Sequence, residues 1–141
     1  MGVVHRRTGE GPDWRWDGVE VEGYTHTAAT KQVLIGKNDG SFNFSLRFFT
    51  IPPRSFSNLD HHAHEHGVII MNGCARVMLG DTFEEVRAGD VVYIESWERH
   101  QFENLTDEPL TFLCIIPPRP AQTQAEGEPA LAGTTASSTA R

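Results

Sequence analysis

Short runs of β-branched and aromatic residues, separated by turn-forming residues, fill the middle of the chain. Apolar positions do not repeat there with the 3.6-residue period of a helix over any stretch long enough for an average helix that lacks Gly or Pro. The runs predict strands instead. Their ranges are 31–35, 42–51, 67–71, 75–79, 83–86, 91–94 and 110–116. The pattern therefore predicts an all-β protein.

Turn signals between these runs limit the architectures that the strands can form. Gly36 to Gly40, Pro52-Pro53, Asn72-Gly73, Gly80-Asp81 and Ala88 to Asp90 each combine residues that favour tight turns. Strands that recur roughly every 8 to 12 residues with such turns are typical of a sandwich or barrel. We therefore expect two sheets curled around one core.

Composition divides the chain into three parts. We place the barrel at residues 30–118 and an N-terminal arm at 1–29, which adds an edge strand or contacts a partner subunit through Trp14 and Trp16. Residues 119–141 are rich in Ala, Thr, Ser and Gly and lack aromatic residues and a sustained apolar period. Such a segment does not bury enough surface to offset its ordering entropy, so we predict a disordered tail.

The formal net charge of −7 and the pI of about 5.4 argue against nucleic acid as a partner, because nucleic-acid binders carry a clustered basic face. No apolar stretch is long enough to span a membrane, and the start of the chain lacks a signal-peptide pattern. We expect a cytoplasmic protein with no membrane partner, in which Cys74 and Cys114 are small buried thiols.

The run "DHHAHEH" at residues 60–66 holds four of the seven histidines. In an extended segment, side chains two residues apart share a face, so Asp60, His62, His64 and His66 would lie on one side. Imidazole and carboxylate together suit Fe, Mn, Ni, Cu or Zn. The same run is also compatible with a solvated loop or a pH-responsive cluster. A distant further ligand would favour the metal site, and His100 is the candidate.

Two stretches, "DHHAHEHGVIIMNG" at 60–73 and "AGDVVYIESWERHQFEN" at 88–104, resemble the two sequence motifs of the cupin superfamily. Gly73 closes the first motif and places His66 at the position of its Glu or His ligand. Counting back by the usual spacing places His62 and Asp60 at the two histidines of the H-x-H element. In the second motif, Gly89, His100 and Asn104 fall at the family spacings.

The resemblance implies a double-stranded β-helix, or jelly-roll barrel, with a divalent transition metal held by His62, His66, His100 and a fourth group. That group is Asp60 or His64, because Asp60 replaces the family's first histidine. The resemblance also implies a small-molecule substrate and a homodimer.

Three further departures from the family pattern involve residues with special backbone roles. Arg54 stands in place of the opening glycine of the first motif. Glu95 and Trp97 replace the proline and glycine of the second. They either occupy an exposed turn or line the mouth of the barrel.

Small cupins with such motifs are variously dioxygenase-like, isomerase-like or cyclase-like. We expect a metal-dependent enzyme, with a dioxygenase-like oxidoreductase as the first hypothesis. The alternatives are an isomerase, cyclase or lyase, and a cupin that binds a small molecule without converting it. We expect Phe48, Met71 and Phe102 to line the interior, whereas Arg47 either binds an anionic substrate there or faces solvent.

Overall fold

The structure is a computed structural model that describes residues 1–118. It confirms the all-β prediction: residues 1–118 contain no α-helix and a single 3-10 turn, η1 (Lys37–Asp39). The N-terminal strands are β1 (Arg7–Thr8), β2 (Arg15–Trp16), β3 (Glu22–Gly23), β4 (Thr30–Ile35) and β5 (Ser45–Ile51). The remaining strands are β6 (His66–Asn72), β7 (Cys74–Leu79), β8 (Thr82–Arg87), β9 (Val91–Ile94), β10 (His100–Asn104) and β11 (Leu110–Ile116).

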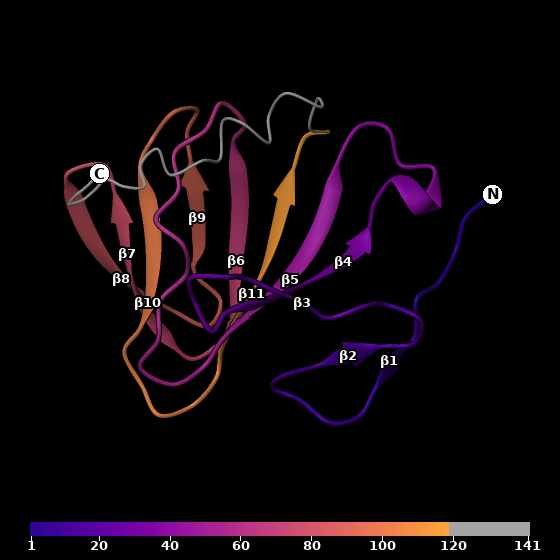
Figure 1. The fold of residues 1–141 in the computed structure, drawn as a ribbon, viewed down its shortest axis with the longest axis horizontal. Coiled ribbons are helices and arrows are strands. Elements are labelled where there is room, and N and C mark those ends of the chain that lie inside the picture. The colour runs from indigo at the N-terminus through magenta and orange to yellow at the C-terminus, as the bar shows by residue number, and fades with distance from the viewer. Residues whose placement is uncertain (119–141) are drawn as a thin grey trace.

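Two antiparallel sheets form the barrel (Figure 1). The larger has the order β3-β4-β5-β11-β6-β9, and the smaller has the order β10-β7-β8. In Figure 1 the β7–β8 hairpin lies at one side of the molecule, and β4 and β5 lie at the other. The strand order shows the crossovers of a jelly roll, because β11 inserts between β5 and β6, which are far earlier in the chain.

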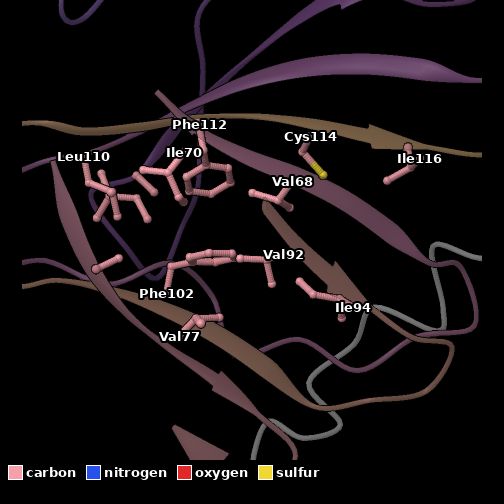
Figure 2. Close-up of a cluster of buried hydrophobic side chains, with 13 residues drawn as sticks. Val68, Ile70, Val77, Val92, Ile94, Phe102, Leu110, Phe112, Cys114 and Ile116 are labelled. Atoms are coloured by element: carbon pink, nitrogen blue, oxygen red, sulfur yellow. The ribbon is translucent and has the colours of Figure 1, made fainter. Parts of the chain in front are cut away.

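The core lies between the two sheets (Figure 2). Ile70 and Phe112 extend from the larger sheet toward Val77 and Phe102 of the smaller one. The rings of Phe102 and Phe112 stack with centroids 4.5 Å apart. Burying large apolar side chains of this kind stabilises the fold by about 1.5 to 3 kcal/mol each.

Strand β10 is absent from the sequence-based strand prediction. Its sequence, HQFEN, holds one apolar residue, so it lacks the apolar alternation that reveals a half-buried strand. The alternation exists nevertheless, because His100, Phe102 and Asn104 are all buried. The apolar pattern did not reveal this strand, because His100 and Asn104 on its inner face are polar. The strand nevertheless pairs with β7 along its whole length.

The N-terminal arm covers the outer face of β5. Phe48 stacks on Trp14 with centroids 6.3 Å apart and meets Trp16 edge-on at 5.0 Å. The Thr50 hydroxyl donates a 2.6 Å hydrogen bond to Asp13 Oδ1 on the same face. The expectation that Phe48 lines the barrel interior is therefore wrong, because the arm buries Phe48 on the opposite side of the strand.

The other expectations about the fold have different outcomes. Phe102 does lie in the core, but Met71 is 37% exposed on the outer face of β6 and does not line the interior. No helix among residues 1–118 has the length and apolarity that a membrane crossing needs. The predicted tail, 119–141, lies outside the described residues, and the homodimer stays a prediction.

Candidate metal centre

Three histidines from separate parts of the chain meet inside the barrel. His66 is the first residue of β6, His100 is the first residue of β10 in the facing sheet, and His62 lies in the loop before β6. All three are at least nine-tenths buried. Their ring centroids form a nearly equilateral triangle, with sides of 4.8 Å, 4.9 Å and 5.0 Å.

The ring nitrogens are close enough to bind one ion. The three ligand atoms lie within 4.8 Å of one another. The Nε2 atoms of His62 and His66 are 3.1 Å apart. Two imidazole nitrogens that bind one cation at about 2.0–2.1 Å, at a right angle, lie about 3 Å apart. This pair therefore has the spacing of two metal ligands.

The hydrogen bonds of the Nδ1 atoms indicate which ring nitrogen of His62 and His100 can bind a metal. His62 Nδ1 lies 3.1 Å from the carbonyl oxygen of His64, and His100 Nδ1 lies 2.8 Å from that of Glu98. A carbonyl oxygen only accepts hydrogen bonds, so each Nδ1 carries the proton and donates it. The Nε2 atom of each neutral ring then keeps its lone pair for a metal, which is the usual arrangement around metal-bound histidines.

His66 has a different partner. Its Nδ1 atom lies 3.0 Å from Cys114 Sγ and 3.4 Å from Nη2 of Arg47. The sulfur is the acceptor available to an Nδ1 proton, because the guanidinium group only donates. Cys114 is buried, as expected, whereas Cys74 is only partly buried. Both thiols are free.

Burial keeps His66 and His100 uncharged near pH 7. Burial, followed by the nearby His100 and Arg47, holds the pKa of His66 far below its usual value. Burial likewise lowers the pKa of His100 to about 4. Neutral imidazole is the form that binds metals, so protons do not compete for these two sites near pH 7. The chemistry of the donor set thus fits a divalent transition ion.

Asp60 and His64, the two candidates for a fourth ligand, are not part of the converging group of three. The half-buried ring of His64 stacks on that of His62, with centroids 3.7 Å apart. Asp60 and His100 pair through their backbones, with both N–H···O distances at 3.0 Å. Both residues thus lie beside the centre, and the identity of the fourth ligand stays a prediction.

The histidine run does not lie in a regular strand, because β6 begins only at His66. Residues 61–65 form a loop, so the strand alternation that predicted a shared face for Asp60, His62, His64 and His66 is not the cause of their positions. His61 is exposed and lies against Trp97, with ring centroids 5.1 Å apart.

The substituted glycine positions keep a glycine-like backbone. Arg54 has a φ of 61° and Trp97 a φ of 66°, and these are the non-glycine residues with positive φ among residues 1–118. Left-handed conformations favour glycine because a Cβ atom crowds the following carbonyl. The turns at these two positions are therefore retained although the glycines are replaced. Trp97 is half exposed and its backbone N–H donates to the carbonyl of His62 at 2.8 Å, so it also supports the histidine loop.

We predict that Trp97→Gly raises the free energy of unfolding by up to about 1 kcal/mol, because it removes the crowding of a left-handed side chain. Trp97→Ala is the matched control, since it also removes the ring but keeps the Cβ atom. Chemical denaturation of the metal-free proteins measures both. Equal stability of the two variants would contradict this explanation of the turn.

Arg47 is the residue beside the centre that sequence reasoning left undecided. Its side chain is buried, so the interpretation that it faces solvent is wrong. It lies opposite Cys114 in the β5–β11 pairing, and its guanidinium group lies 4.9 Å from the ring centroid of Phe49. Alternation places Arg47 on the same face of β5 as Phe49 and Ile51, which pack toward the core, but the sequence alone does not show which face is the inner one.

Comparison with known proteins places the chain in a family. Residues 47–116 match the family model described as a cupin domain. A curated relative, 1-methylthio-D-xylulose 5-phosphate methylsulfurylase from Rhodospirillum rubrum, is 36% identical over 109 residues, which cover 73% of this chain and 69% of the relative. The chain therefore belongs to the cupin superfamily, as the two motifs indicated.

Two solved structures are similar in sequence and fold. A cupin-2 domain protein from Rhodospirillum rubrum is 32% identical, with a TM-score of 0.68 and coverage of 84% of this chain and 86% of the other. The polyketide cyclase RemF from Streptomyces resistomycificus is 26% identical, with a TM-score of 0.68 and coverage of 83% and 79%. The names of the methylsulfurylase and the polyketide cyclase describe different chemistries, so family membership alone does not define the reaction.

Proposed function

We propose that this cupin is a metal-dependent enzyme whose small-molecule substrate reacts at the centre formed by His62, His66 and His100. One observation carries the proposal: three buried imidazoles, from β6, from β10 in the facing sheet and from the loop before β6, converge with their ligand atoms within 4.8 Å of one another. Fe, Mn, Ni, Cu and Zn all suit such donors. An ion held there would polarise a carbonyl oxygen or lower the pKa of a bound water molecule.

The residues around the centre have distinct tasks in this proposal. The carbonyl groups of His64 and Glu98 orient the rings of His62 and His100. Val68 and Ile94 are buried on the inner face beside His66 and limit access of water. Three protein ligands leave coordination positions open, which is the arrangement of catalytic rather than structural metal sites.

For the reaction, we propose conversion of a phosphorylated keto sugar that carries a methylthio group. The support is the 36% identity to the methylsulfurylase, whose name specifies 1-methylthio-D-xylulose 5-phosphate. A dioxygenase-like oxidoreductase is the second candidate, because a three-histidine centre with open positions also suits an iron ion that reacts with O₂. The 26% identity to a polyketide cyclase keeps a cyclase or isomerase as a third.

The test incubates the metal-loaded protein with 1-methylthio-D-xylulose 5-phosphate and follows the sugar phosphate by ³¹P NMR and dissolved oxygen with an electrode. We expect conversion of the substrate without oxygen consumption, and loss of conversion in protein treated with a chelator. Oxygen uptake in proportion to substrate would favour the dioxygenase. Binding without conversion would favour a non-catalytic role.

A further inference from the structure

Arg47 places a positive charge inside the barrel, and within residues 1–118 this charge has no negative partner. Its side chain is only 6% exposed, and no ion pair within residues 1–118 includes it. Its Nη2 atom donates a hydrogen bond to Sγ of Cys114 at 3.2 Å and lies 3.4 Å from Nδ1 of His66. Neither group is a carboxylate, so residues 1–118 supply no counter-ion that matches the guanidinium group.

One N–H donor of the Arg47 guanidinium group also has no acceptor within the described part of the chain. The buried Nε atom has no hydrogen-bond partner. A guanidinium group carries five N–H donors in a planar fork, and oxyanions with two oxygens accept two of them at once. The ring of Phe49, 4.9 Å from the guanidinium carbon, lies against the side chain and restricts its movement. The group is thus held in place with donors available.

A buried charge that lacks a partner is costly, because the group loses its hydration and gains no ion pair. The cost is offset when an anion binds next to it. Arg47 Nη2 lies only 3.4 Å from Nδ1 of His66, one of the three candidate metal ligands. An anionic group held by Arg47 would therefore lie within the length of a small molecule from the centre.

We propose that Arg47 is the anion-binding group of the substrate site, and that it pairs with a carboxylate or phosphate of the substrate while the reacting part lies at the three-histidine centre. This inference rests on the proposed function, because it takes the interior next to His66 as the substrate site. It limits the substrate class to small anionic molecules. It also assigns Arg47 a role in specificity rather than in the chemistry at the centre.

The test measures binding of inorganic phosphate and of acetate to the metal-loaded protein by isothermal titration calorimetry. The variants Arg47→Met and Arg47→Gln both remove the charge. We expect the affinity for the preferred anion to fall about tenfold or more in each, since a buried charged group loses its partner. Whether phosphate or acetate shows the larger fall identifies the anion that the site accepts.

Arg76→Met is the matched control, because Arg76 is exposed on β7 and pairs with Glu103. We expect this variant to bind both anions as the unchanged protein does. Metal content and circular dichroism establish that each variant is folded and loaded. If either uncharged Arg47 variant that folds keeps the full affinity for both anions, the inference is wrong and Arg47 has only a packing role.

The experiments distinguish failure of this inference from failure of the proposed function. If the sugar phosphate is converted and the uncharged Arg47 variants have an unchanged KM, this inference fails and the proposed function stands. If the unchanged protein converts nothing but binds anions in a way that depends on Arg47, the inference stands and the proposed reaction fails.

Discussion

Replacing His100 by Ala is expected to lower the affinity for a divalent metal by about a hundredfold or more, since even loss of a group that only orients a ligand costs about 10- to 100-fold. His100 is the single contribution of the smaller sheet to the converging group. After dialysis, elemental analysis should find metal well below one ion per chain. We expect the same of His62→Ala and His66→Ala, because each removes one of three imidazoles.

His61→Ala is the control within the same run. His61 is exposed and lies against Trp97, outside the converging group. We expect its replacement to leave the metal content unchanged. An equal loss of metal from His61→Ala and His62→Ala would refute the assignment, as would full metal content in His100→Ala.

The same measurement addresses the fourth ligand. Asp60→Ala and His64→Ala remove the two candidates that lie beside the centre. We expect one of these changes to reduce the metal affinity and the other to leave it nearly unchanged. If neither has an effect, the fourth position belongs to water.

The sequence was sufficient to predict the all-β fold and the convergence of His62, His66 and His100. Turn chemistry separates the strands, and the spacing of the two motifs defines the histidine positions independently of strand detail. The loop at 61–65 shows why this matters, because strand alternation was the wrong local argument for these residues. The motif spacing predicted the convergence although the local geometry differed.

The two faces of β5 were harder to predict. An apolar residue is expected inside and a charged one outside, but Phe48 and Arg47 are placed the other way round. Trp14 and Trp16 of the arm cover Phe48. Phe48 on the outer face is therefore buried, as Arg47 is on the inner face. Hydrophobic alternation loses its meaning where a distant segment buries the second face. Only the three-dimensional packing of the arm resolves this.

The polar residues of the second motif have separable roles, which leads to a prediction about Asn104. Its side chain is 1% exposed. Its Nδ2 atom donates to the carbonyl oxygens of Ile51 at 3.0 Å and Glu108 at 2.7 Å, and its Oδ1 atom accepts from the backbone N–H of Thr106 at 2.9 Å. One amide thus connects the end of β5 to the loop before β11.

Asn104→Ala is expected to lower the free energy of unfolding by about 3 kcal/mol, because it leaves buried backbone groups without partners. Asn38→Ala is the control: Asn38 is exposed in η1, and surface changes of this kind cost within about 0.5 kcal/mol. Urea unfolding of the metal-free proteins measures both, and a loss below about 0.5 kcal/mol for Asn104→Ala would contradict the structural role. Asn104 and His100 lie on the same face of β10, yet the first should affect stability and the second metal content. Folded Asn104→Ala protein that has lost its metal would show that the two roles are not separable.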